Sequence, residues 1–209
     1  DACRRLGIYA LPADFVLSVV IPVYNEAKTL EKVIARVRET HLPMEIICVD
    51  DGSRDGTREV LERLANEQDI KAVFHEKNQG KGAALRTGFL EATGDVVVVQ
   101  DADMEYDPQD IRLLLQPILE NSADVVYGSR FLVRREARVL YYGHFLANRF
   151  LTTLSNIFTN LNMTDIETGY KALRTPLLKS LILTSTGFGM EVEITAHVAH
   201  AGDAMPQEG

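Results

Sequence analysis

Residues 95–105 of the chain read DVVVVQDADME. The four consecutive valines at 96–99 predict a strand that is buried on both faces, as in a parallel sheet covered by helices. Three acidic residues then follow at every second position: Asp101, Asp103 and Glu105. In an open α/β sheet, ligands bind at the carboxyl ends of the strands. This stretch therefore predicts both a fold class and the position of a binding site.

The acidic residues suggest a site for a metal ion and a phosphate. Carboxylates are hard oxygen ligands that suit Mg²⁺ or Mn²⁺, and substrate phosphates complete the coordination of such ions. We therefore expect Asp101 and Asp103 to contribute to a metal–phosphate site. The alternative is an acidic, solvated loop that caps the next helix. That alternative suits Asp107, because Asp107 precedes Pro108 in the order typical of a helix start.

The bulk composition is that of a globular protein. The chain has 209 residues, of which 46% are apolar and 25% are charged, so it is long enough for one well-buried core. Its net charge of −8 argues against a nucleic-acid partner. Cys3 and Cys48 indicate no disulfide framework, which fits a reducing compartment. We expect a soluble or peripheral protein, because no apolar run reaches the roughly 18–20 residues that span a bilayer and no signal segment opens the chain.

Strands and helices are expected to alternate from about residue 17 to residue 128. The expected strands lie at 17–23, 45–49, 72–74, 96–99 and 124–128. This alternation predicts an α/β fold with a mostly parallel sheet flanked by helices on both faces. Since neither a linker nor an internal repeat interrupts it, we expect a single domain over residues 1–209 with its core at about 17–200.

The pattern changes after Gly128. A basic segment that includes Arg130 leads into a long apolar helix, expected over about 142–161, which carries Arg149. Both a core helix and a helix that lies on a membrane surface with anionic head groups fit this pattern. A polar turn at 165–171, a short strand and two further helices complete the chain.

Polar side chains follow three of the expected strands. They are residues 24–26, the pair Asp50 and Asp51, and residues 101–105. Because the carboxyl ends of parallel strands meet at one edge of a sheet, these residues should converge on one strongly negative cleft. Asp50 or Asp51 could instead accept a hydrogen bond from the imide N–H of a base. Residues 80–82, Gly-Lys-Gly at a helix start, are a modest phosphate or ribose signal, and turn geometry alone could also explain both glycines.

Several motifs together resemble family-2 glycosyltransferases with the GT-A fold. In order, they are PVYNE at 22–26, DDGSRDGT at 50–57, NQGKG at 78–82 and DAD at 101–103. GSRF at 128–131 and DIETGYK at 165–171 resemble polyprenyl-phosphate sugar transferases, similar to the dolichyl-phosphate mannose and glucose synthases. The resemblance covers about residues 17–200, and it is specific only when the motifs are taken jointly.

The resemblance implies an inverting, metal-dependent enzyme. It would move a hexose from a nucleotide diphosphate sugar, of the UDP-glucose or GDP-mannose type, to a polyprenyl or dolichyl phosphate. The donor-binding residues it implies are Pro22, Tyr24, Asn25, Glu26, Asp50, Asp51, Gly80, Lys81, Asp101, Ala102 and Lys171. The implied ligands of Mg²⁺ or Mn²⁺ are Asp101, Asp103 and Glu105. The implied catalytic residues are Asp103, Arg130, Arg149, Asp165 and Glu167.

The implied acceptor chemistry is consistent with these residue types. A lipid phosphate is already an anion, so it needs a strong general base less than a hydroxyl acceptor does. The guanidinium groups of Arg130 and Arg149 would bind this phosphate bidentately, assisted by Lys171. Related enzymes normally continue into a basic loop and often into membrane helices. We therefore expect this chain to be truncated before a membrane-anchoring part or to need an anchoring partner, at the cytoplasmic face of a membrane.

Other functions remain open at this point. A glycosyltransferase with a hydroxyl acceptor would use Asp165 or Glu167 as its base. A non-catalytic module that binds a nucleotide sugar is a further alternative. A processive polysaccharide synthase is disfavoured because its product-site motif contains a tryptophan and this chain has none. The Asp-x-Asp form and the chain length also disfavour a phospho-receiver domain.

Overall fold

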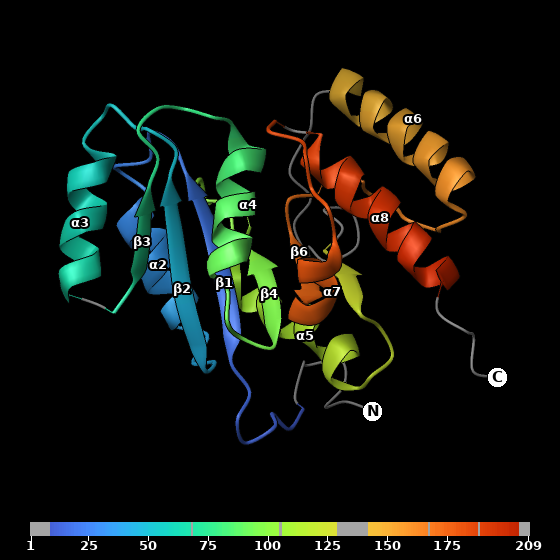
Figure 1. Cartoon of the computed structure of the whole chain (residues 1–209), viewed down its shortest axis with the longest axis horizontal. Coiled ribbons are helices and arrows are strands. Elements are labelled where there is room, and N and C mark those ends of the chain that lie inside the picture. The colour runs from blue at the N-terminus through green and yellow to red at the C-terminus, as the bar shows by residue number, and fades with distance from the viewer. Residues whose placement is uncertain are drawn as a thin grey trace.

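The valine strand β4 (Val96–Val99) lies near the centre of a six-stranded sheet in the computed structural model of the chain (Figure 1). The order of the strands is β3-β2-β1-β4-β6-β5. The other strands are β1 (Leu17–Val23), β2 (Met44–Asp50), β3 (Lys71–Phe74), β5 (Val125–Tyr127) and β6 (Lys171–Arg174). The structure describes residues 9–67, 69–104, 106–128, 142–166, 168–187 and 189–204.

The sheet is mostly parallel, which confirms the predicted fold class. Strand β1 runs parallel to β2 and to β4, and β2 runs parallel to β3. The exception is β6, which lies between β4 and β5 and is antiparallel to both. The alternation up to residue 128 could not reveal this arrangement, because β6 comes from a later part of the chain than the strands that it separates.

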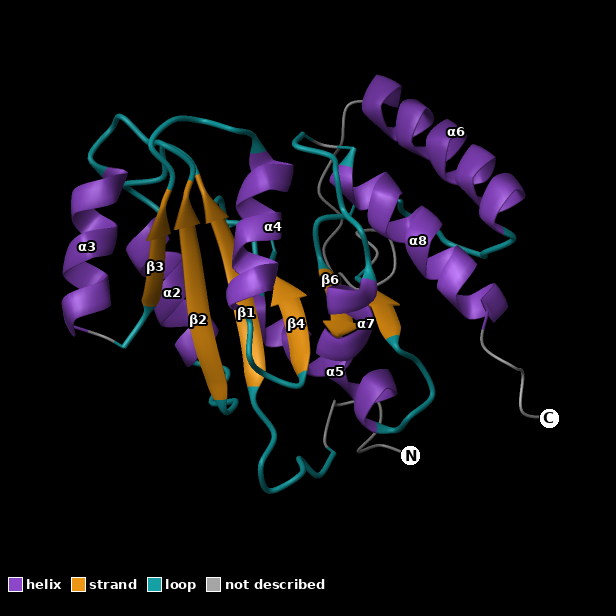
Figure 2. Ribbon diagram, viewed as in Figure 1, coloured by secondary structure: helices purple, strands orange, loops and turns teal. Residues whose placement is uncertain are grey.

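Helices cover both faces of the sheet (Figure 2). They are α2 (Leu30–Arg38), α3 (Thr57–Glu67), α4 (Lys81–Glu91), the 3-10 helix η1 (Pro108–Asp110), α5 (Ile111–Leu119), α6 (Tyr142–Thr159), α7 (Thr175–Ser180) and α8 (Met190–Ala204). Helices α2, α3 and α5 contribute to the core on one face, and α4, α7 and α8 contribute to the core on the other. Helix α6 lies at the outer side of α8 and packs against it.

Strand β4 is buried on both faces, as the run of valines predicts. Val96 and Val98 belong to one core cluster, and Val97 and Val99 belong to the other. This division follows from the geometry of a strand, in which successive side chains point to opposite faces. The four valines are at most 4% exposed. Their burial ties the end of β4, and with it Asp101, firmly to the core.

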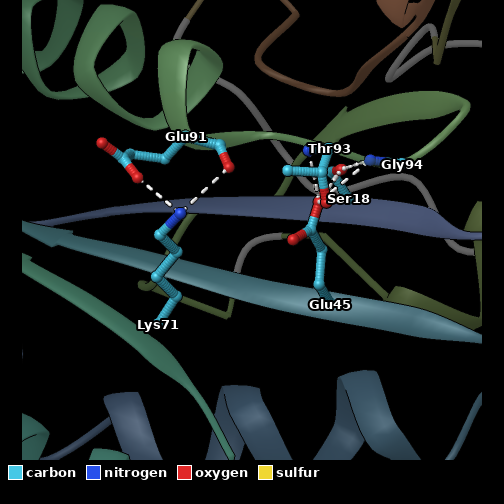
Figure 3. A network of polar contacts seen from close by, with 6 residues as sticks. All are labelled: Ser18, Glu45, Lys71, Glu91, Thr93 and Gly94. Atoms are coloured by element: carbon cyan, nitrogen blue, oxygen red, sulfur yellow. Dashed lines mark hydrogen bonds and ion pairs between the residues drawn. The ribbon is translucent and has the colours of Figure 1, made fainter.

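A polar network connects the amino ends of the central strands (Figure 3). Glu45 at the start of β2 accepts hydrogen bonds from the Ser18 hydroxyl at 2.5 Å, the Thr93 N–H at 2.6 Å and the Gly94 N–H at 3.0 Å. Burial tends to raise the pKa of Glu45, but these hydrogen bonds to its charged form outweigh burial and lower the pKa. The network therefore fixes the entry into β4 against β1 and β2, at the sheet edge opposite to the predicted site.

Helix α6 turns a polar side inward and an apolar side outward. Asn148 and Thr152 are buried, and they bind the segment after α6: Asn148 Nδ2 donates to Asp165 Oδ1 at 2.8 Å, and Thr152 Oγ1 accepts from the Ile166 N–H at 3.2 Å. The large apolar side chains that are exposed are Leu146, Phe150, Leu151, Leu154, Ile157 and Phe158. This arrangement is the reverse of a core helix. None of the helices in the described ranges combines the length and the apolar character needed to cross a bilayer.

Candidate active site

A cavity of about 430 Å³ lies where β1, β2 and β4 end. The residues that line it are Pro22, Val23, Tyr24, Glu26, Asp51, Asn78, Gly80, Lys81, Ala84, Asp101, Ala102 and Asp103. Most of the residues that the sequence associates with a donor or a metal are thus brought to one cavity, although they come from four separate motifs. This convergence is what parallel strands produce at their carboxyl edge. The roles of the individual residues stay predictions.

Lys81 is a half-buried positive charge with two carboxylate partners. Its Nζ lies 2.8 Å from Asp101 Oδ1 and 3.7 Å from Glu191 Oε1. Burial tends to lower the pKa of Lys81, but the ion pairs with Asp101 and Glu191 outweigh burial and raise it. The wall of the cavity therefore carries a permanent positive charge directly beside the first aspartate of the Asp-x-Asp motif.

The cavity offers two carboxylates to a metal ion. Asp101 and Asp103 both line it. Among the described residues, no group of three or more His, Cys, Asp or Glu side chains is placed to hold a metal by itself. Glu105, the expected third ligand, lies outside the described residues. A carboxylate pair still fits Mg²⁺ or Mn²⁺, because such ions are held by one or two carboxylates and leave other positions to water and to substrate phosphates.

Asp51 has a fixed orientation in the cavity wall. Its Oδ1 accepts a hydrogen bond from the Gln79 N–H at 2.9 Å, and its Oδ2 accepts one from the Gly80 N–H at 2.8 Å. His75 Nδ1 lies 2.7 Å from the same Oδ1, and His75 Nε2 lies 3.0 Å from Thr87 Oγ1. A neutral imidazole that donates from Nδ1 and accepts at Nε2 satisfies both contacts. His75 was not singled out from the sequence, yet it orients the carboxylate that faces the cavity.

Asn25 and Asp50 hold loops together and are not among the residues that line the cavity. Asn25 Oδ1 accepts from the Arg54 N–H at 2.8 Å, and the Asn25 N–H donates to Ser53 Oγ at 2.9 Å. Asp50 is fully buried, and its Oδ1 accepts from the Ser53 N–H at 3.3 Å. Both side chains thus stabilise the loops that follow β1 and β2.

The glycines at the start of α4 make room for another part of the backbone. Gly80 has a positive φ of 97°, and a Cβ there would collide with the Thr186 carbonyl oxygen. A Cβ on Gly82 would lie 2.7 Å from the Ser185 carbonyl oxygen. The Thr186 carbonyl also accepts a hydrogen bond from the Ala83 N–H at 3.3 Å. Backbone geometry therefore accounts for both glycines, and the predicted phosphate or ribose contact is not needed to explain them.

The residues expected on the acceptor side are only partly described. Arg149 is exposed on α6. Asp165 is 2% exposed and accepts a hydrogen bond from Asn148. Arg130 and Glu167 lie outside the described residues. Of the two that are described, neither Asp165 nor Arg149 lines the cavity.

Lys171 is buried near two charged residues of the cavity, Lys81 and Asp101. Its side chain is 2% exposed, its Nζ donates to the Thr168 carbonyl, and the Nζ lies 5.1 Å from the centre of the Tyr127 ring. Burial lowers the pKa of Lys171 to about 8, although the nearby Glu191 carboxylate opposes this shift. Lys171 therefore supports the residues around the site from within the core and does not line the cavity.

Gly169 is a further site residue that the sequence analysis did not single out. Its backbone packs against the Asp101 carboxylate, and its N–H donates to the Tyr106 hydroxyl at 3.0 Å. Tyr106 in turn stacks on Tyr170, with 5.0 Å between the ring centres. Gly169 belongs to a motif quoted above, but only the contact with Asp101 in the folded chain reveals what it does.

Comparisons with known proteins identify the family. Residues 18–182 match the family model described as glycosyl transferase family 2. The dolichol-phosphate mannosyltransferase of Pyrococcus furiosus is 32% identical over 182 residues, which cover 85% of this chain and 51% of that protein. The undecaprenyl-phosphate mannosyltransferase of Micrococcus luteus is 32% identical over 190 residues, which cover 88% of this chain and 77% of that protein. The chain thus spans about half the length of the first of these relatives.

A solved structure has the same fold. It is glucosyl-3-phosphoglycerate synthase from Mycobacterium tuberculosis, in complex with Mn²⁺, UDP and glucosyl-3-phosphoglycerate. The TM-score is 0.67 at 26% sequence identity, and the match covers 87% of this chain and 64% of that one. The sequence and structure comparisons thus agree with the GT-A architecture described above. The chain belongs to glycosyl transferase family 2.

Proposed function

We propose that this protein transfers a hexose from a nucleotide diphosphate sugar to the phosphate of a polyprenyl lipid, with inversion at the anomeric carbon. One observation carries the proposal: Asp101, Asp103, Lys81 and Asp51 line a single cavity at the carboxyl edge of the sheet. The two mannosyltransferase relatives, which are named for dolichol phosphate and undecaprenyl phosphate, support the acceptor class. The UDP and Mn²⁺ bound to the solved relative support the donor class.

The donor would extend across the cavity from Asp51 to Asp101. The Asp51 carboxylate accepts from two backbone N–H groups and can still accept from the N–H of a base. Tyr24 lines the same cavity and is 46% exposed, so its ring is available to a nucleoside. Another relative is named a UDP-N-acetylglucosamine–dolichyl-phosphate N-acetylglucosaminyltransferase, so the family resemblance alone does not select the donor sugar.

The diphosphate would lie against Asp101, Asp103 and Lys81. When bound by the two aspartates, Mg²⁺ or Mn²⁺ would neutralise the charge that develops on the leaving diphosphate. Lys81 adds a second positive charge at a fixed position, 2.8 Å from Asp101. Because the ammonium is largely removed from solvent, its attraction for phosphate oxygens is screened less than that of a surface lysine.

The burial of Asp165 speaks against one of the two candidate bases, Asp165 and Glu167, of a hydroxyl acceptor. A hydroxyl acceptor would need a base, and Asp165 is buried, accepts from Asn148 and is absent from the cavity lining. A phosphate acceptor needs positive charge to orient it, and needs a strong base less. Arg149 is exposed on α6 and would bind such a phosphate, together with Arg130.

The apolar face of α6 supports docking on a membrane. Six large apolar side chains, among them Phe150 at 65% and Phe158 at 80% exposure, lie on an outward-facing helix. A helix with such a face can lie in the boundary between lipid head groups and acyl chains. Docking of α6 on the cytoplasmic face of a membrane would bring Arg149 to the phosphate of a polyprenyl acceptor.

Radiolabel transfer tests this function. Purified protein is incubated with labelled UDP-glucose, GDP-mannose and other nucleotide sugars, and with undecaprenyl or dolichyl phosphate, with and without EDTA. We expect label in the lipid fraction from at least one donor, and loss of that label with EDTA. Asp103→Asn should abolish transfer, whereas Asp14→Asn, which changes an exposed aspartate that does not line the cavity, should not. Donor consumption that needs a hydroxyl acceptor and no lipid phosphate would contradict the proposal.

A further inference from the structure

Glu191 is a buried carboxylate in the first turn of α8 that has no place in the function proposed above. Its side chain is 9% exposed. Its Oε1 lies 3.7 Å from Lys81 Nζ, and its Oε2 has no hydrogen-bond partner among the described residues. A buried acid whose hydrogen bonds are incomplete is costly to the fold. The feature therefore calls for an explanation beyond packing.

Glu191 gives Lys81 a second anionic partner. The first partner is Asp101, whose Oδ1 lies 2.8 Å from Lys81 Nζ. Asp101 also lines the cavity in which the metal and the diphosphate are proposed to bind. A cation at Asp101 and the Lys81 ammonium would compete for the same carboxylate, and the two positive charges would repel each other. A second carboxylate 3.7 Å from Lys81 Nζ offers the ammonium another partner and so reduces this competition.

Glu191 also interacts with a second lysine, Lys171. Glu191 is also the strongest of the nearby charges that favour the protonated form of the buried Lys171. Its carboxylate therefore balances two lysines, one of which lines the cavity and one of which does not.

We propose that Glu191 is a positioning residue of the donor site: its ion pair holds the Lys81 side chain in place, so that the Asp101 carboxylate is available to the metal ion. This inference rests on the proposed function, because it assumes that a nucleoside diphosphate and a metal bind in the cavity. Glu191 itself need not touch the substrate. Its effect on nucleotide binding should therefore act through Lys81, the one of its two lysine neighbours that lines the cavity.

The test is calorimetric binding of UDP and of GDP in the presence of Mn²⁺. Glu191→Gln keeps the shape of the side chain and removes its charge. We expect it to weaken Mn²⁺-dependent nucleotide binding about tenfold, which corresponds to about 1.4 kcal/mol. Glu193→Gln serves as the matched control, because it removes the same charge from the same helix turn. Glu193 binds the backbone N–H groups of residues 184 and 185. We expect the control to change the affinity less than twofold.

A double-mutant cycle separates positioning from a structural role. In a Lys81→Met background, Glu191→Gln should weaken binding no further, because coupled residues are not additive. A merely structural role would lower the melting temperature in both backgrounds and leave the affinity of the folded protein unchanged. Glu191→Asp, which keeps the charge, should restore part of the affinity that Glu191→Gln loses.

The outcomes distinguish this inference from the proposed function. If the wild-type protein binds neither UDP nor GDP with Mn²⁺, the proposed function is wrong. If the wild type binds one of them and Glu191→Gln binds it within twofold, the positioning role is overturned while the proposed function stands. The positioning role is also overturned if Glu191→Gln still weakens binding tenfold in the Lys81→Met background.

Discussion

A Cβ atom on Gly169 would lie 2.5 Å from Asp101 Oδ2, closer than two such atoms can approach. The other oxygen of the same carboxylate, Oδ1, pairs with Lys81 at 2.8 Å. The Asp101 carboxylate thus lies between the Gly169 backbone and the half-buried Lys81 ammonium. The side chain at the centre of the proposed metal site is therefore oriented before any ligand binds, which reduces the entropy lost on binding.

Gly169→Ala should displace Asp101. The added methyl group occupies the space of the carboxylate oxygen, and overpacking of this kind costs about 1–3 kcal/mol of stability. We expect the variant to fold, with a lower melting temperature, and to lose at least about tenfold in Mn²⁺-dependent nucleotide affinity, or about 1.4 kcal/mol. Gly187→Ala is the control, because a Cβ at Gly187 meets nothing within 4 Å. If Gly169→Ala bound the nucleotide with wild-type affinity, the orientation of the Asp101 carboxylate against Gly169 would not matter for binding.

His75→Phe should weaken nucleotide binding through Asp51. The substitution removes the ring nitrogen that lies 2.7 Å from Asp51 Oδ1 and leaves the two backbone hydrogen bonds in place. A hydrogen bond to a charged group contributes about 1.5–3 kcal/mol, so we expect a loss of about tenfold in calorimetric affinity. Thr87→Val, which removes only the contact to His75 Nε2, should have a smaller effect. If the wild type, His75→Phe and Thr87→Val bound the nucleotide with equal affinity, His75 would not be needed to orient Asp51.

Lys171 should make the stability of the fold depend on pH above pH 8. Its pKa is about 8 in the folded chain and has an ordinary value of 10.5. Between these values the unfolded chain binds more protons than the folded chain, so the free energy of unfolding contributed by Lys171 rises with pH. From pH 7.5 to pH 10 the wild type should gain about 2 kcal/mol relative to Lys171→Met, measured by urea unfolding.

The exposed Lys71 provides the control for this measurement. Its side chain is 44% exposed and pairs with Glu91 at 2.5 Å on the surface (Figure 3). Lys71→Met should show no such pH-dependent difference from the wild type, because surface pairs are screened by solvent. A pH profile of Lys171→Met parallel to that of the wild type would mean that Lys171 is not perturbed by burial.

Phe150 and Phe158 should contribute to membrane binding. Replacing both by Ser removes two large apolar side chains from the exposed face of α6. We expect at least fivefold weaker sedimentation with vesicles that contain anionic lipid, since burying one such side chain contributes about 1.5–3 kcal/mol. The melting temperature should not fall, because neither side chain is buried. Leu90→Ser, at a position on α4 that is 76% exposed, is the control. Unchanged sedimentation of the double variant would exclude α6 as the docking face.

Much of the fold and of the cavity could be predicted from local patterns. The valines of β4 and the acids after them are consecutive in the sequence, so their burial and their position at the strand end follow from strand geometry alone. The polar groups after β1 and β2 converge on the same edge for the same reason. The antiparallel placement of β6 could not be predicted in this way, because it depends on a pairing between distant parts of the chain.

The residues that support the candidate site could not be identified from the sequence alone. Helical periodicity shows that α6 has an apolar face, but not that this face points outward. Lys171 belongs to a motif that suggests phosphate binding, yet the structure buries it. Gly169 and Glu191 matter through contacts with Asp101 and Lys81, which are far away in the sequence. Such roles come from tertiary packing, and no local pattern encodes them.

The proposed function depends above all on the binding of a divalent cation by Asp101 and Asp103, together with the diphosphate of a nucleotide sugar. The most direct measurement is anomalous X-ray scattering from crystals of the protein soaked with Mn²⁺ and either UDP or GDP. We expect an anomalous peak within coordination distance of both carboxylates, with the diphosphate beside it and the base near Asp51. Strong nucleotide density elsewhere on the protein, or a cavity that contains neither Mn²⁺ nor nucleotide at saturating concentrations, would contradict it.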